Sequence, residues 1–144
     1  MSVLSDFRLD DKVVFIAGEA NGLTPVMAEG LAEAGAKVFI IAPSQATVEG
    51  SMWAVASKQG QALGMMSDPN NPSAVEDGLE MVKEIWGRVD VLINNCRFPL
   101  SKPFEVLSVE EWTAVMDQNA TCAFNLSQIL GREMLSNGKG RIIH

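Results

Sequence analysis

Two glycines, Gly18 and Gly22, stand between a short apolar run and a segment of helical periodicity. The run from Val13 to Ala17 is β-branched and aromatic and too short for a helix, so it predicts a buried strand. Apolar and small residues recur at positions 26, 27, 30, 31 and 34, which predicts a helix directly after the glycines. A strand that enters a helix through glycines directs backbone N–H groups and the positive end of the helix dipole at one point. This arrangement suits a phosphate.

The same alternation of apolar strand and helix continues along the rest of the chain. Further strands are expected at 37–41, 62–66, 89–93 and 141–144, and further helices at 45–59, 74–86 and 109–135. Two capping boxes, Ser73 with Glu76 and Ser108 with Glu111, mark the starts of the last two helices. Strands that alternate with helices imply right-handed crossovers and a parallel sheet. We therefore predict an α/β fold, a three-layer αβα arrangement around a doubly wound parallel sheet of about five strands, truncated after the fifth.

Composition and charge exclude several classes of function. The 144 residues are 47% hydrophobic and 20% charged, which is typical of a globular domain. A formal net charge of -7 leaves no basic patch for a nucleic acid. No apolar run approaches the roughly 20 residues of a membrane span, and the N-terminal segment lacks the apolar core of a secretory signal. Cys96 and Cys122 lie far apart without metal-like spacing, which favours reduced thiols in a cytoplasmic protein and no metal site.

Several motifs occur in order along this alternation. Residues 17–24 read Ala-Gly-Glu-Ala-Asn-Gly-Leu-Thr, residues 90–95 read Asp-Val-Leu-Ile-Asn-Asn, and residues 140–143 read Gly-Arg-Ile-Ile. Asp68 follows the third expected strand, and Asn119 lies in the long last helix. In this order and spacing the motifs resemble the N-terminal half of the short-chain dehydrogenases/reductases, whose glycine motif is Thr-Gly-x-x-x-Gly-x-Gly. The resemblance implies that residues 1–144 form a single, partial Rossmann-type dinucleotide-binding domain.

The resemblance also implies a chemistry, which is NAD- or NADP-dependent hydride transfer on the carbonyl or alcohol group of a small-molecule substrate. In this family a tyrosine transfers the proton, a lysine lowers the pKa of that tyrosine, and a serine orients the substrate. Asn119 is the residue of this chain that matches the catalytic set. The positions that match the family's cofactor-binding residues are Gly18, Asn21, Gly22, Leu23, Asp68 and Asn94, and Asp68 matches a contact to the adenine.

The chain departs from the family pattern at the catalytic residues and around the cofactor. It contains no tyrosine, and the sequence ends at His144, about where the serine segment is expected. His144 is a lone histidine, so we assign no role to it. Thr24 replaces the third glycine, and Thr24-Pro25 is typical of an N-cap followed by proline at the first helical position. The hydroxyl of such a cap would compete with a phosphate for the same N–H groups.

The charges expected around the cofactor do not select between NAD and NADP. Glu19 adds a negative charge near the expected pyrophosphate. Pro43 stands at the turn where an acidic residue usually binds the ribose 2′-OH of NAD. The turn also lacks an Arg or Lys that would bind the 2′-phosphate of NADP. NAD and NADP therefore both stay open, and so do weak binding and no binding.

Other functions and roles stay open beside the oxidoreductase. One is a catalytically inactive, degenerate Rossmann module that binds nucleotide weakly or serves only in assembly. Halohydrin dehalogenases use the same scaffold without a nucleotide, but they carry a bulky aromatic residue near the position of Gly22, which argues against that class. Asn94 fits a structural bond within the strand as well as a cofactor contact. Asn119 fits the catalytic site as well as a bond to its own helix backbone.

The last helix and the fifth strand predict self-association. A parallel sheet is normally covered on both faces and continued by further strands, so the fifth strand would be an exposed edge. We expect a homo-oligomer formed through the helix at 109–135, with Val115, Ala123 or Leu126 buried between copies.

Overall fold

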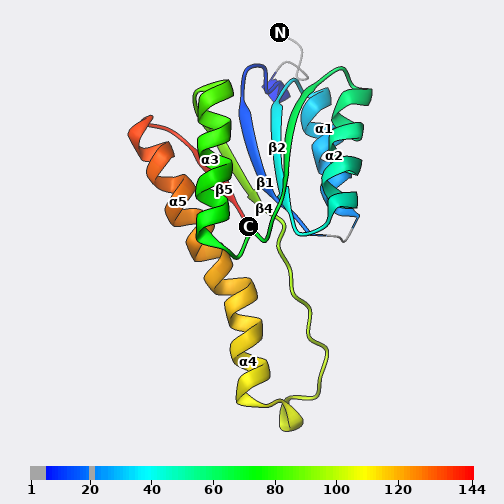
Figure 1. The fold of residues 1–144 in the computed structure, drawn as a ribbon, viewed down its shortest axis with the longest axis vertical. Coiled ribbons are helices and arrows are strands. Elements are labelled where there is room, and N and C mark those ends of the chain that lie inside the picture. Colours follow the sequence, from blue (N-terminus) through cyan, green and yellow to red (C-terminus); the bar gives the residue numbers. More distant parts are fainter. Residues whose placement is uncertain (1–5, 20–21) are drawn as a thin grey trace.

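The computed structural model describes residues 6–19 and 22–144 and shows a three-layer αβα arrangement (Figure 1). Five parallel strands form one sheet in the order β3-β2-β1-β4-β5. The predicted α/β fold is confirmed. The strands are β1 (Val13–Ala17), β2 (Lys37–Ala42), β3 (Gln61–Met66), β4 (Val91–Asn94) and β5 (Arg141–Ile143), and the α-helices are α1 (Leu23–Glu33), α2 (Gln45–Ser57), α3 (Pro72–Trp86), α4 (Val109–Met116) and α5 (Cys122–Ser136).

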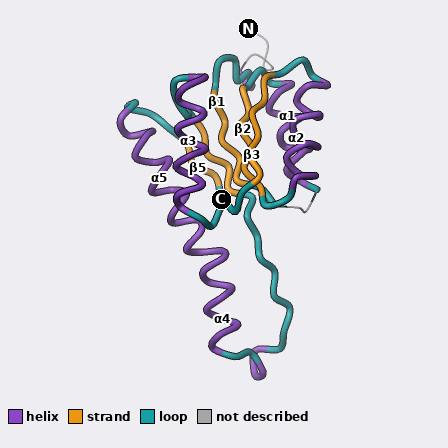
Figure 2. Tube along the Cα trace, viewed as in Figure 1, coloured by secondary structure: helices purple, strands orange, loops and turns teal. Residues whose placement is uncertain are grey.

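The central strand β1 is buried on both faces. Helices α1 and α2 cover one face of the sheet and α3 and α5 cover the other (Figure 2). Successive side chains of β1 alternate between these layers, so Phe15 packs in the layer of α3 and α5 while Ile16 packs in the layer of α1 and α2. This double burial is the reason why β1 is a continuous apolar run.

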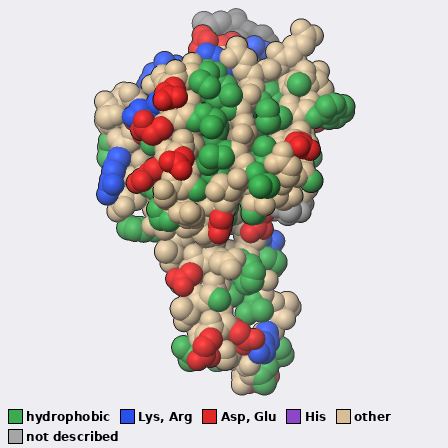
Figure 3. Space-filling view, in the orientation of Figure 1, with side chains coloured by type: hydrophobic (Ala, Val, Ile, Leu, Met, Phe, Trp, Pro, Cys, Tyr) green, Lys and Arg blue, Asp and Glu red, His purple; other side chains and the backbone are tan. Residues whose placement is uncertain are grey.

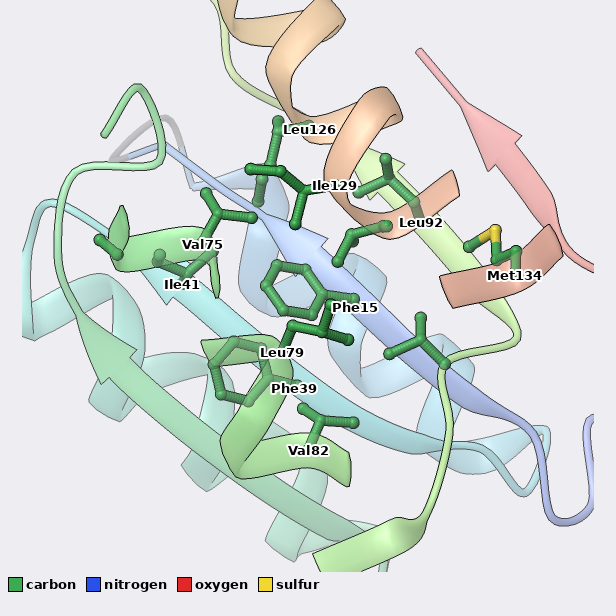
Figure 4. Packing of buried hydrophobic residues seen from close by; sticks show 14 of the residues in the cluster. Phe15, Phe39, Ile41, Val75, Leu79, Val82, Leu92, Leu126, Ile129 and Met134 are labelled. Atoms are coloured by element: carbon green, nitrogen blue, oxygen red, sulfur yellow. The ribbon is translucent and has the colours of Figure 1, made fainter. Parts of the chain in front are cut away.

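Aromatic and branched side chains fill the layer between the sheet and the helices α3 and α5 (Figure 4). The rings of Phe15 and Phe39 lie 4.6 Å apart between centroids, on paired residues of β1 and β2. Val75, Leu79 and Val82 of α3 pack onto them, together with a second set from α5 and β4 (Leu92, Leu126, Ile129 and Met134).

The start of α3 differs from the predicted one. The Asn71 side chain accepts a hydrogen bond from the Ser73 N–H at 3.1 Å, and Pro72 is the first helical residue. The predicted cap of Ser73 with Glu76 is therefore wrong, because proline at the first helical position extends the helix toward its N-terminus. The second predicted capping box is confirmed, since Ser108 and Glu111 bond reciprocally at the start of α4.

The long last helix is interrupted by one π-helical turn. Helix α4, the π turn Asp117–Thr121 and α5 follow one another without a break. The arm, which we define as residues 97–116, contains the loop after β4, a short 3-10 turn and α4, and it projects away from the sheet (Figure 1). In the space-filling view the arm extends from the body with hydrophobic side chains on its surface (Figure 3).

The residues expected between copies differ in their exposure. Leu126 is fully buried in the core of its own chain, so the prediction that it contacts a second copy is wrong. Val115 and Ala123 are half-buried. Among the described residues, none of the helices combines the length and the apolar character that a membrane crossing requires.

Candidate functional site

The carboxyl ends of the parallel strands meet at one edge of the sheet, where a cleft of about 420 Å³ opens. Glu19 after β1, Pro43 after β2, Asp68 after β3 and Cys96 after β4 line it. Strand β1 pairs with β2 on one side and with β4 on the other, and the connection from β1 to β2 runs in the opposite direction across the sheet from the connection from β4 to β5. In open α/β sheets, ligands bind at such a reversal point.

The two glycines of the turn are required for different reasons. Gly22 has φ 77°, a conformation that favours glycine, and directly precedes α1. Apart from its chain neighbours, no described residue has an atom within 4 Å of a Cβ built on it. A Cβ on Gly18 would lie 2.6 Å from the Thr24 side chain, so Gly18 is required by packing within the protein. Leu23 is the first residue of α1, and Asn21 lies outside the described residues.

Thr24 is fully buried and does not cap α1. Its hydroxyl lies 3.3 Å from the Glu19 carbonyl, to which it donates, and accepts a hydrogen bond from Asn95 Nδ2 at 3.0 Å. Gly22 is the N-cap residue, and it provides no side-chain cap. The predicted cap at Thr24 is therefore wrong, and with it the expected competition between the Thr24 hydroxyl and a phosphate for the α1 amides.

Asp68 closes its own turn and also lines the cleft. Its Oδ1 accepts hydrogen bonds from the Asn70 backbone N–H at 2.9 Å and from Asn70 Nδ2 at 3.0 Å. The side chain is exposed. Asp68 therefore holds the loop after β3 while its exposed side chain faces the cleft.

Asn94 is bound on both sides of its amide group. Its Oδ1 accepts a hydrogen bond from the Cys96 N–H at 3.0 Å, and its Nδ2 lies 3.2 Å from His144 Nδ1. The next residue, Asn95, donates its backbone N–H to the Ala17 carbonyl at 2.8 Å. These bonds hold the end of β4 and the loop that follows it.

Asn119 joins the π turn to the arm. Its Oδ1 accepts from the Phe98 N–H at 3.0 Å, and its Nδ2 donates to the Phe98 carbonyl at 3.0 Å and to the Val115 carbonyl at 2.9 Å. The cleft lining includes its neighbours Gln118 and Thr121 but not Asn119 itself. Its bonds in this structure position the loop, and π turns often occur at functional sites.

The structure brings together two cysteines that the sequence separates. Cys96 and Cys122 both line the cleft, and both are free thiols. A hydrogen bond with Cys122 raises the pKa of the Cys96 thiol, and its burial and the negative charges of Glu19 and Asp68 act in the same direction. No spacing rule reveals this pair, because the packing of α5 against the end of β4 decides it.

The protein backbone beside the cleft suits a nucleotide, but the charged side chains that line the cleft do not. The glycine turn places the start of α1 after the carboxyl end of β1, at the edge of the sheet where the cleft opens, and the free N–H groups of a helix start suit a phosphate. The described residues that line the cleft include the carboxylates of Glu19, Asp68 and Asp117 and neither Lys nor Arg. A phosphate group held here depends on backbone amides, and the carboxylates oppose it.

Comparison with known proteins decides the family. The family model for short chain dehydrogenases matches residues 12–144. The chain belongs to this family. 3-Oxoacyl-acyl-carrier-protein reductase FabG of Vibrio cholerae is 34% identical over 137 residues, and D-threitol dehydrogenase of Mycolicibacterium smegmatis is 28% identical over 144 residues. The alignments cover 95% and 100% of this chain but 55% of each relative, so the chain spans about half of their length.

Solved structures give the same assignment. A short-chain type dehydrogenase/reductase from Mycobacterium marinum has a TM-score of 0.88 at 27% identity, and the match covers 99% of this chain and 58% of the M. marinum chain. Xylitol dehydrogenase with bound NAD+ has a TM-score of 0.85 at 25% identity, and the match covers 92% of this chain and 52% of the xylitol dehydrogenase chain. The resemblance to the N-terminal half of the family, with its Rossmann-type fold, is confirmed.

Proposed function

We propose that this short-chain dehydrogenase binds NAD or NADP and supplies the nucleotide-binding half of an oxidoreductase that acts on a small-molecule carbonyl or alcohol. The observation that carries the proposal is the glycine turn at Gly22, which places the start of α1 at the reversal point of the sheet. The family match and the NAD+-bound xylitol dehydrogenase among the similar structures support it.

The residues of this chain would hold the cofactor rather than transfer its proton. The backbone at Gly22 and Leu23 would bind a phosphate, and Asp68 would contact the adenine. The nicotinamide, when bound, supplies the group that exchanges hydride with the substrate. These 144 residues contain no tyrosine, so the proton transfer of the family is proposed only for a protein with further residues.

Direct titration of the 144-residue chain with NADH, NAD+ and NADP+ tests nucleotide binding. NADH fluorescence and calorimetry give a dissociation constant for each ligand. Affinity in the micromolar range is expected if the backbone amides outweigh the repulsion from Glu19, Asp68 and Asp117. An absence of binding up to millimolar ligand would contradict the proposal.

A second candidate function is assembly without catalysis. The acidic lining of the cleft favours it, and so does the exposed apolar surface of the arm, which includes Phe104, Val109 and Trp112. Val109, Trp112 and Met116 follow one another at helical spacing on α4, so they share one helix face. We propose that the chain self-associates through this face, and that it acts in the cytoplasm, where its two free cysteines stay reduced.

A further inference from the structure

The ring of His144 lies between a strand end and a helix. Its Nδ1 is 3.2 Å from Asn94 Nδ2 at the end of β4, and its Nε2 is 3.1 Å from Ser127 Oγ on α5. Strand β5, which ends just before His144, pairs with β4. The imidazole therefore connects the end of β4, which leads to Cys96 in the cleft lining, to α5, whose first turn also lines the cleft.

The partners of the ring fix the direction of each hydrogen bond. Asn94 Oδ1 already accepts from the Cys96 N–H, which leaves the Nδ2 amide as the group that faces His144. An amide nitrogen only donates, so His144 Nδ1 must accept. A neutral imidazole that accepts at Nδ1 carries its proton on Nε2, and Nε2 then donates to Ser127 Oγ.

The hydrogen bonds of Ser127 agree with donation from His144 Nε2. Ser127 Oγ donates its own proton to the Ala123 carbonyl at 2.7 Å, so the bond to His144 uses an oxygen lone pair. The four bonds run without conflict from the Cys96 amide through Asn94, His144 and Ser127 to the backbone of α5.

We infer that His144 is a positioning residue for the nucleotide cleft, acting as the neutral imidazole protonated on Nε2 and working through Asn94. The part of this inference that concerns nucleotide binding rests on the function proposed above. Asn94 holds the Cys96 amide, and Cys96 lines the cleft. Asn95, which lies between them, donates to the Thr24 hydroxyl, so a displacement of Asn94 would reach both Cys96 in the cleft lining and the first turn of α1.

The ring's protonation state can be read directly, because the chain contains one histidine. A long-range 1H–15N spectrum of labelled protein near neutral pH is expected to show one imidazole with bare Nδ1 and protonated Nε2. Ser127→Ala should shift the Nε2 resonance, whereas Ser136→Ala should not. Ser136 is the matched control, since its hydroxyl donates to the Glu133 carbonyl at 2.8 Å in the same way. A ring protonated on Nδ1, or one that exchanges freely between both forms, would overturn the inference.

Nucleotide binding tests the positioning role. His144→Ala should speed amide exchange at Cys96 and weaken NADH binding by up to about tenfold, the effect of losing one or two hydrogen bonds. His144→Gln, whose side-chain oxygen can accept from Asn94, should restore most of both.

Two outcomes separate this inference from the proposed function. If wild type binds NADH and His144→Ala binds it equally well, with unchanged exchange at Cys96, His144 has no positioning role and the proposed function stands. If wild type binds no nucleotide, the proposed function fails, and the ring spectrum together with the exchange of Cys96 still decides whether His144 holds this loop.

Discussion

At the scale of single residues, Gly22 and Gly87 form a matched pair. Both have positive φ, 77° and 83°, and at both a Cβ would lie more than 4 Å from every described atom that is not a chain neighbour. Gly22 precedes α1 after the carboxyl end of β1, whereas Gly87 follows α3. Replacing either by alanine forces a left-handed conformation on an L-residue, so each variant should lose about 1 kcal/mol of unfolding free energy.

Nucleotide binding should distinguish the two variants. In Gly22→Ala the added methyl group occupies space where a phosphate would approach the backbone, so we expect the NADH dissociation constant to rise at least about tenfold. Gly87→Ala should leave it unchanged, as titrations of the two folded variants would show. Equal affinity in both would place the nucleotide away from the glycine turn.

Asp90 is a buried carboxylate whose bonds connect the starts of β1 and β4. It accepts from the Val13 N–H at 3.0 Å and from Arg88 Nε at 3.0 Å. Burial raises its pKa, but these hydrogen bonds and the charges of Arg88 and Lys12 outweigh burial, so the pKa of Asp90 lies below its ordinary value of 3.8. The carboxylate therefore stabilises the fold above about pH 4, and this stabilisation is lost as the pH falls through the lowered pKa.

The variant Asp90→Asn tests whether this stabilisation is lost as the pH falls. At pH 7 it should cost about 1.5–3 kcal/mol of unfolding free energy, the usual contribution of a hydrogen bond to a charged group. The difference from wild type should shrink below about pH 4, as the pH falls through the lowered pKa of the native carboxylate. Urea unfolding at several pH values measures it, with Asp77→Asn on the exposed surface of α3 as the control. A difference that grows on acidification would contradict the assignment.

At the scale of elements, the close approach of α3 to the sheet depends on Gly78. A Cβ there would lie 2.9 Å from Phe39 Cζ, on the ring that packs against Phe15. The core is close-packed, so Gly78→Ala should push α3 away and destabilise the protein by about 1–2 kcal/mol, despite the better helix propensity of alanine.

Gly30 in α1 provides the opposite case. No described atom beyond its own helix backbone and its chain neighbours lies within 4 Å of a Cβ built there, and the residue is exposed. Gly30→Ala should therefore stabilise the protein by about 0.5–1 kcal/mol, since alanine loses less backbone entropy in a helix. Thermal unfolding of the two variants compares them, and stabilisation by Gly78→Ala would show that α3 is less tightly packed than described.

At the scale of the whole molecule, the apolar face of α4 should decide the oligomeric state. Trp112 is 52% exposed on this face, and Trp53 on α2 is 75% exposed. A charge introduced into a buried contact between copies is costly, so Trp112→Glu should convert an oligomer to a monomer at micromolar concentration. Trp53→Glu should not change the mass measured by light scattering. The same shift in both variants, or a monomeric wild type, would contradict association through α4.

The sequence alone determined the parts of this protein that depend on local pattern. The β1 run, the helical periodicity after Gly22 and the Ser108 cap predicted elements that the structure contains, because apolar spacing and capping act within a few residues. The order of these motifs also identified the family. The three-layer αβα arrangement followed from the alternation of strands and helices.

Only the tertiary structure decided what distant segments do to one another. Thr24 resembles an N-cap in sequence, but the packing of β4 beside β1 brings Asn95 to its hydroxyl. Leu126 lies on the helix expected to join copies, yet the docking of α5 buries it in its own core. Cys96 meets Cys122, and His144 meets Asn94 and Ser127, across separations that no local pattern encodes. The reason is physical, since hydrogen bonds and close packing act between neighbours in space, and the fold chooses those neighbours.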